Sequence, residues 1–141
     1  MARWLVDGMN VIGSRPDGWW RDRDGAVRRL VERLRLLAAE ADDVTGVTLV
    51  LDGRPLPDLP EGEHAGVAVR YGRRGGRNAA DDRIVALVTD DPEPGTLSVV
   101  SSDRDLGRRA RALGATVVPA GELLRRLDLL CSPECGGGRP R

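Results

Sequence analysis

The chain has 141 residues, enough for one domain with its own core and too few for two. Hydrophobic residues make up 40% and charged residues 31%, which excludes collagen-like and coiled-coil classes. No apolar run approaches the roughly 20 residues of a membrane span, so we expect a cytoplasmic protein. Basic and acidic residues number 22 each, so the chain has no global positive field and any nucleic-acid binding must be local.

Apolar segments of strand length alternate with helical patterns along the chain, which indicates a parallel sheet covered by helices. The first expected strand spans residues 3–7. A helix is expected over 25–41, because its apolar residues recur at three- and four-residue spacing. Residues 47–51 form the continuous apolar run of a strand buried on both faces, and 67–71 form a shorter strand nearer the sheet edge.

The second half of the chain begins with an Arg- and Gly-rich loop at 72–77. Asn78 is the natural N-cap of a helix over 79–88. The remaining elements are a strand at 96–101, a helix at 104–113 that Gly114 stops, a strand at 116–118 and a helix at 122–130. We therefore predict one domain over residues 1–130 and a flexible Gly/Pro-rich tail over 131–141.

Acidic residues collect at the carboxyl ends of the expected strands, where parallel α/β sheets bind ligands. Asp7 ends the first strand, Asp52 ends the second, and Asp103 follows the fourth. Asp81 and Asp82 lie in the first turn of the helix over 79–88. If the first and fourth strands are neighbours, Asp7 and Asp103 face each other, with Asp82 reaching in from above.

Carboxylates that lie together without basic partners repel one another, so such a cluster is expected where a cation binds. The amide oxygen of Asn10 adds another oxygen ligand, and the expected site has no Cys or His nearby. This donor set favours Mg²⁺ or Mn²⁺ over zinc. A metal held in this way supports hydrolysis of phosphodiesters, because it lowers the pKa of a bound water and stabilises the transition-state charge.

Three segments carry a family resemblance. The run LVDGMNVIG at residues 5–13 resembles the opening strand motif of NYN domains in the PIN-like nuclease superfamily, especially the YacP-like branch. ADDRIV at 80–85 and VVSSDRDL at 99–106 resemble the second and third acidic motifs of that superfamily. The resemblance covers roughly residues 3–130, and its specificity comes from three motifs in the same order.

The resemblance implies a three-layer α/β/α sandwich with a mostly parallel five-stranded sheet of order 3-2-1-4-5. It also implies a metal-dependent ribonuclease that acts on RNA, with single-stranded RNA as the expected substrate. The implied catalytic residues are Asp7, Asn10, Asp81, Asp82 and Asp103, of which Asp7, Asp82 and Asp103 hold Mg²⁺ or Mn²⁺. Asn10 and Asp81 would hold metal-bound waters. Supporting positions are Asp52, Ser101, Ser102 and Asp105.

Each acid also has a structural alternative. Helix capping is the alternative for Asp81, Asp82 and Asp103, because carboxylates are favoured at helix N-termini. A turn at Asp7 and Gly8 is another, although an acid that ends a buried strand needs a partner. Asp105 fits a solvated first-turn acid.

The arginines divide into two groups. Those on the helix over 25–41 are expected to form a solvated face paired with Glu32 and Asp24: Arg28, Arg29, Arg33 and Arg35. The second group is Arg70 with the predicted RNA-binding residues Arg73, Arg74 and Arg77. They flank the loop before the acidic helix, where they could carry a phosphate backbone toward the metal.

A few other side chains leave alternatives open. Trp19 and Trp20 could stack on unpaired bases or pack a helix end against the sheet. His64 is expected to be solvated, so the chain offers no His general base. Cys131 and Cys135 are too few for a disulfide framework or a complete zinc site.

Two rivals to the ribonuclease hypothesis come from other classes. One is a non-catalytic RNA-binding module of the same fold, associated with a ribosome or another protein. The other is a phosphatase of the haloacid dehalogenase type, which is disfavoured because no second Asp stands two residues after Asp7 and the chain has no Lys. The RNA that is cut, endo or exo cleavage, the number of metals and homodimer formation are left open.

Overall fold

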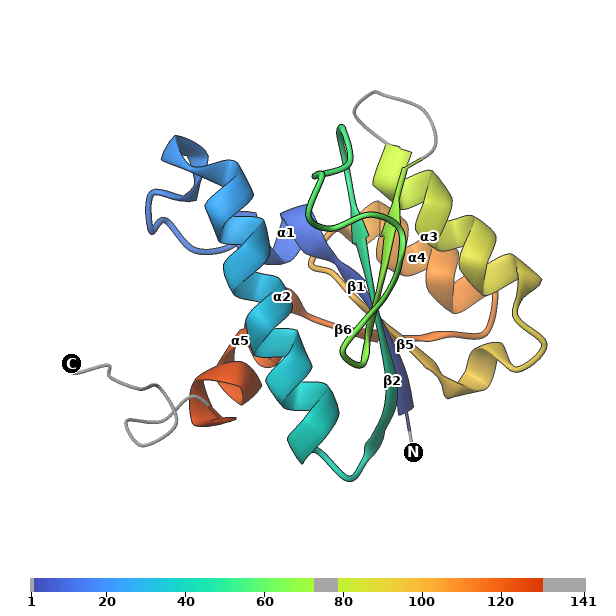
Figure 1. Ribbon diagram of the computed structural model, residues 1–141. Coiled ribbons are helices and arrows are strands. Elements are labelled where there is room, and N and C mark those ends of the chain that lie inside the picture. The colour runs from blue at the N-terminus through green and yellow to red at the C-terminus, as the bar shows by residue number, and fades with distance from the viewer. Residues whose placement is uncertain (1, 73–78, 131–141) are drawn as a thin grey trace.

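The computed structural model describes residues 2–72 and 79–130. In these ranges a six-stranded sheet of order β3-β4-β2-β1-β5-β6 lies between two layers of helices (Figure 1). All neighbouring strands are parallel except the antiparallel pair of β3 and β4. The strands are β1 (Ala2–Asp7), β2 (Val44–Leu51), β3 (Gly62–His64), β4 (Val67–Tyr71), β5 (Leu97–Val100) and β6 (Thr116–Val118).

The predicted α/β class and strand order are confirmed, but the predicted number of five strands is wrong. The sixth strand, β3, extends the sheet beyond β4, where Gly62 is opposite Val69 and His64 is opposite Val67. Its three residues show no apolar alternation and lie close to prolines and glycines, so the sequence reads as a loop. Backbone pairing to the edge of β4 makes this segment a strand.

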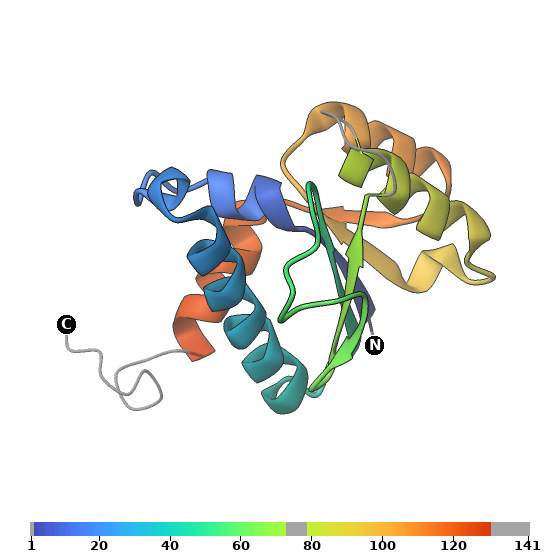
Figure 2. The same cartoon turned by 45° about the horizontal axis from the view of Figure 1, so that its top comes forward.

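The helices cover both faces of the sheet. In Figures 1 and 2, α2 and α5 lie on one side of the sheet and α3 and α4 on the other. The helices are α1 (Gly8–Gly13), α2 (Arg23–Glu40), α3 (Ala79–Asp90), α4 (Arg104–Ala112) and α5 (Ala120–Leu130), with 3₁₀ turns η1 (Trp19–Arg21) and η2 (Pro94–Thr96). The short helix α1 was not predicted, because its six residues are too few to show a helical period.

The local sequence explains where α2 begins. The carboxylate of Asp22 caps the helix by accepting a hydrogen bond from the Gly25 amide at 3.0 Å. The helix therefore begins at Arg23, two residues before the predicted start. The buried residues of α2 form one stripe of three- and four-residue spacing, from Ala26 to Leu37. This stripe packs on β2 and β4 and fixes α2 against the sheet.

Alternate residues of the central strands enter two separate cores. Trp4 and Val6 of β1 belong to the core under α1, α2 and α5, whereas Leu5 belongs to the core under α3 and α4. The same alternation in β2 places Leu49 in the first core and Val50 in the second. Burial on both faces accounts for the continuous apolar runs of these strands.

Surface ion pairs differ in part from the expected ones. Arg35 pairs with Glu32 at 2.6 Å, as predicted. The expected pairing of the other helix arginines with Asp24 is wrong: Arg28 pairs with Asp58 and Arg33 with Asp128, because the loop after β2 and helix α5 bring these acids over α2.

His64, predicted to be solvated, makes its ring contact at an exposed position. The residue lies in β3, and its Nε2 is 2.6 Å from the carbonyl oxygen of Pro60. In the described ranges, no helix is long and apolar enough to cross a membrane.

Candidate active site

The point where the strand order reverses lies between β1 and β5. Val6 of β1 is opposite Val100 of β5, so the next residues, Asp7 and Ser101, meet where both strands end. The Ser101 hydroxyl donates to Oδ2 of Asp7 at 2.9 Å, and both side chains are buried. Parallel α/β sheets bind ligands beyond the carboxyl ends of their strands at such a switch point, which we call the crevice, and here this edge of the sheet carries a buried carboxyl.

Burial is the main influence on the chemistry of Asp7. Only 5% of this residue is exposed, and desolvation raises the pKa of its carboxyl to about 6. The Ser101 hydrogen bond opposes this rise, whereas the negative charges of Asp81 and Asp52 add to it. Asp7 precedes α1 but makes no capping hydrogen bond, and the nearby Asn10 amide has the smallest influence on its pKa. A turn or cap role therefore does not account for this acid.

Asp103 is held by the hydrogen bonds that begin α4. Its Oδ1 accepts from the amides of Asp105 and Leu106 at 2.9 and 3.1 Å, and its own amide donates to the Ser101 hydroxyl at 3.1 Å. The capping alternative for Asp103 is thus confirmed. Among the described residues none donates to Oδ2, so capping leaves one carboxylate oxygen for a ligand.

Two further hydrogen bonds hold the segment after β5, one to α1 and one to α5. The side-chain oxygen of Asn10 accepts from the Ser102 amide at 2.8 Å, which holds the start of α1 beside Asp103. The Ser102 hydroxyl in turn accepts from the Ala120 amide at 3.0 Å, at the beginning of α5. Asn10 and Ser102 therefore fix the walls of the crevice.

Asp81 extends into the crevice from the other helix layer. It is half-buried, and burial, followed by the charges of Asp103 and Asp52, raises the pKa of its carboxyl. Arg109 of α4 opposes this rise. Asp81 is thus coupled electrostatically to Asp7, Asp52 and Asp103, which brings four of the predicted acids together.

The other two predicted positions on this side have different surroundings. Asp82 has an exposed side chain, 69% accessible, and forms a loose ion pair with Arg109 at 3.6 Å. Asp52 accepts the Ala80 amide at 2.9 Å and so connects the end of β2 to the start of α3. The structure therefore places Asp82 at the rim of the crevice and Asp52 among its supports.

The remaining predicted residues lie away from the acids or outside the described ranges. Asp105 is exposed and pairs with Arg108 at 2.7 Å, as expected of a solvated first-turn acid. Neither the RNA-binding residues nor the cysteines can be placed, because Arg73, Arg74, Arg77, Cys131 and Cys135 fall outside the described residues, as does the Asn78 cap.

Gly8 is required by the site but was not identified from the sequence as a site residue. A Cβ on Gly8 would lie 2.6 Å from Cδ2 of Leu51 and 2.9 Å from Cδ1 of Leu49, both buried in the core. Only glycine lets α1 begin this close to β2, and this approach places Asp7 at the crevice. The sequence signal is the Asp-Gly pair at a strand end, which also fits an ordinary turn.

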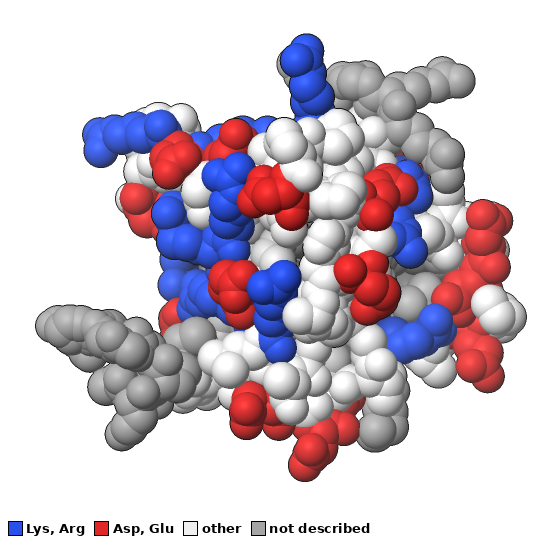
Figure 3. All heavy atoms as spheres, in the orientation of Figure 1, with Lys and Arg blue, Asp and Glu red and all other residues white. Residues whose placement is uncertain are grey.

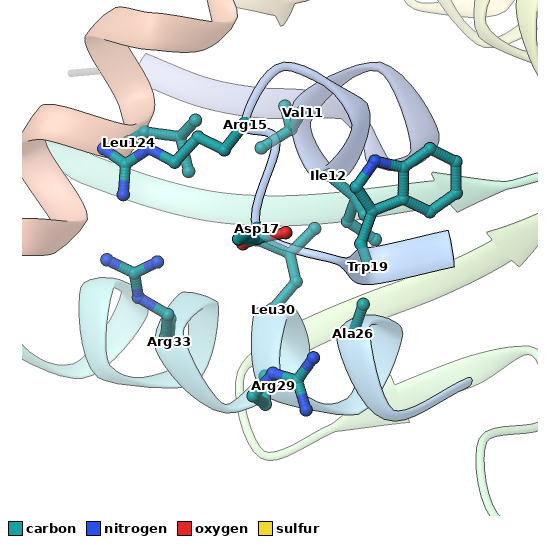
Figure 4. A pocket seen from close by; sticks show the side chains of 10 residues that line it. All are labelled: Val11, Ile12, Arg15, Asp17, Trp19, Ala26, Arg29, Leu30, Arg33 and Leu124. Carbon is teal, nitrogen blue, oxygen red and sulfur yellow. The ribbon is translucent and has the colours of Figure 1, made fainter. Parts of the chain in front are cut away.

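A second cavity, of about 120 Å³, lies between α1, the following loop, α2 and α5 (Figure 4). Trp19 lines it and packs against the core, whereas Trp20 is 56% exposed and meets Trp19 edge to face. The packing alternative is therefore confirmed for Trp19. Arg15 and Arg33 also line this cavity, but both pair with Asp128.

Arginines gather on the α2 side of the molecule in the orientation of Figure 1, with acidic side chains between them (Figure 3). This mixture agrees with the ion pairs of α2 and with the zero net charge of the chain. It is not a continuous basic surface of the kind that binds a polyanion by charge alone.

The sandwich, its strand order and the acids at the switch point together define a PIN-like nuclease fold. The chain belongs to the family of YacP-like NYN domains, whose model matches residues 4–132.

Crystal structures of Rae1 (YacP) from Bacillus subtilis are similar to this chain. A Trp-to-Leu mutant of that protein has a TM-score of 0.70 and 24% identity, covering 92% of this chain and 77% of the other. A second structure of the same protein has a TM-score of 0.67 and 24% identity, covering 92% and 75%. The curated proteins contain no match.

Proposed function

We propose that this domain is a metal-dependent endoribonuclease that hydrolyses phosphodiester bonds of single-stranded RNA at the carboxyl-end crevice. The observation that carries the proposal is the position of Asp7. It is buried at the switch point, accepts a hydrogen bond from the neutral hydroxyl of Ser101, and faces further carboxylates without a basic partner among the described residues. A fold gains nothing in stability from such an arrangement, which instead favours a bound cation.

The donor set fits Mg²⁺ or Mn²⁺. The crevice offers carboxylate and amide oxygens, the ligands these hard cations prefer. No group of three or more His, Cys, Asp or Glu side chains in residues 2–72 and 79–130 is arranged to hold an ion. Mg²⁺ does not require such a group, because it keeps several waters and is often bound through one or two carboxylates and substrate phosphates.

We assign the metal to Asp7 and Asp103, with Asp81 as the third acid of the site, which holds the ion through a bound water. Asp81 takes the place that the sequence suggested for Asp82, because Asp81 is half-buried and coupled to the other acids, whereas Asp82 is exposed beside Arg109. We assign to Asp82 and Asn10 the orientation of water at the rim. When bound, the metal would supply an activated water and neutralise negative charge on the phosphoryl oxygens.

The protein's other groups position these oxygens. Ser101 donates to Asp7 and accepts from the Asp103 amide, so one hydroxyl holds both acids in register. Asp52 holds the first turn of α3, and with it Asp81, against the end of β2. The arrangement needs no movement of these groups before a phosphodiester binds, which is the preorganisation that electrostatic catalysis requires.

Cleavage of a labelled single-stranded RNA and of its circular form tests the proposal. We expect Mn²⁺-dependent cleavage of both forms that is abolished by EDTA and by Asp7→Asn or Asp103→Asn. Asp90→Asn is the matched control, because Asp90 is an exposed acid at the far end of α3. Cleavage that survives Asp7→Asn would overturn the assignment. If RNA is bound but never cut, the domain is a non-catalytic binding module.

A further inference from the structure

We propose that the RNA strand runs from the acidic crevice along a groove between α4 and the connection from β6 to α5. This inference rests on the proposed function and adds the path of the substrate. The groove has a volume of about 450 Å³. Ser101, Ser102 and Asp103 line it together with residues of α4, so the groove is continuous with the crevice.

Three arginines of α4 form one wall of this groove: Arg104, Arg108 and Arg111. Their spacing of four and three residues places them on one face of the helix, about 6 and 4.5 Å apart along its axis. All three are exposed. Arg108 pairs with Asp105, whereas neither Arg104 nor Arg111 has a carboxylate partner among the described residues.

The opposite wall and the floor are uncharged. Val117 and Pro119 line the far side, and Gly107 lies between the arginines on α4. A Cβ on Gly107 would lie 3.6 Å from Cγ1 of Val117 and 3.7 Å from Nη1 of Arg111, both ordinary contacts. The fold therefore tolerates a side chain at Gly107, and its absence leaves the groove open beside the arginines.

Charge explains why the crevice needs this groove. The clustered carboxylates repel a phosphate backbone, and the zero net charge of the chain provides no general attraction. Unpaired arginines next to Asp103 supply local attraction where the strand leaves the acids. The arginines Arg15 and Arg33 of the other cavity suit this task less, because both already pair with Asp128.

Binding of a short fluorescein-labelled oligouridylate in EDTA tests the groove without cleavage. We expect Arg104→Ala/Arg111→Ala to weaken binding about tenfold and to reduce the slope of log K against log salt by about 1.4. The control Arg29→Ala/Arg125→Ala removes the same charge from two exposed arginines of α2 and α5 that have no carboxylate partner in residues 2–72 and 79–130, and it should leave the affinity unchanged.

The Gly107→Gln variant distinguishes RNA binding in the groove from a general effect of the arginine charges. This variant keeps every charge and improves helix propensity, so its Tm should not fall. Its side chain fills the groove beside Arg111, and we expect weaker RNA binding. The proposed RNA path is overturned if the control lowers affinity as much as Arg104→Ala/Arg111→Ala does. It is also overturned if this variant and Gly107→Gln both bind and cut RNA like the wild type. A wild-type protein that neither binds nor cuts RNA overturns the proposed function as well.

Discussion

Replacing Asp7 by Asn should remove the pH dependence of stability that this residue creates. Its carboxyl pKa rises from the ordinary 3.8 to about 6 in the folded protein. The fold therefore favours the protonated form, and stability decreases as the pH rises through 6. A rise of about two pKa units corresponds to roughly 3 kcal/mol at neutral pH, because each unit is worth 1.36 kcal/mol. Asp7 is buried, so solvent screens little of this energy.

The Asn side chain of this variant also lowers the stability of the folded protein. The Asn amide keeps an oxygen that accepts from Ser101 but adds an NH₂ group to a buried position, which costs about 1 kcal/mol without a partner. In EDTA we therefore expect Asp7→Asn to be about 2 kcal/mol more stable than the wild type at pH 7.5. At pH 4 we expect it to be about 1 kcal/mol less stable.

Urea denaturation at the two pH values, followed by circular dichroism, measures this crossover. Added Mg²⁺ should then stabilise the wild type at pH 7.5, because a ligand that binds only the folded state raises its stability by mass action, and should have little effect on Asp7→Asn. A variant that is less stable at both pH values would refute the electrostatic account of this carboxyl. Mg²⁺ that stabilises both proteins equally would place the ion elsewhere.

Three further tests concern hydrogen bonding and packing, at Ser101 and Gly8 beside the crevice and at Trp19 beside the other cavity. Ser101→Ala should cost about 1–3 kcal/mol of unfolding free energy at pH 7.5, because it leaves a buried carboxylate and an amide without their partner; an unchanged urea midpoint would contradict this. Gly8→Ala should lower the free energy of unfolding by about 1–3 kcal/mol through overpacking. Gly13→Ala, whose Cβ would lie 3.7 Å from its nearest neighbour, should leave it unchanged. Equal Tm values for the two variants would show that the core rearranges to accept a Cβ at Gly8. Trp19→Ala should destabilise by about 2–3 kcal/mol, whereas Trp20→Ala should stay within about 0.5, and calorimetry that ranks them in reverse would refute the packing roles.

The sheet could be predicted from the sequence because its central strands are buried on both faces. The continuous apolar run at the end of β2 indicates a strand buried on both faces, and the strand order was implied by the family resemblance. The two elements that were missed have no such signal. β3 has only three residues and is held by the edge of β4, and α1 depends on the approach of Gly8 to β2, which only the tertiary structure shows.

The acids at strand ends could likewise be predicted, because parallel strands deliver their last residues to one edge of the sheet. Asp7 and Asp103 meet through Ser101, a contact that follows from the pairing of Val6 with Val100. The rise in the pKa of Asp7 could not be predicted. It depends on the burial of Asp7, which only the tertiary structure shows.

The angular positions of residues on α3 distinguish Asp81 from Asp82 as the acid that faces the site. In α3 the buried residues are Ala80, Ile84 and Val88, whose directions span about 80° at 100° per residue. Measured from the middle of that stripe, Asp81 is about 60° away and Asp82 about 160° away. The core pattern alone therefore directs Asp81 toward the sheet and Asp82 toward solvent. Motif matching treats the two acids as one pair, whereas the structure holds Asp81 close enough to Asp103 and Asp52 for their charges to raise its pKa.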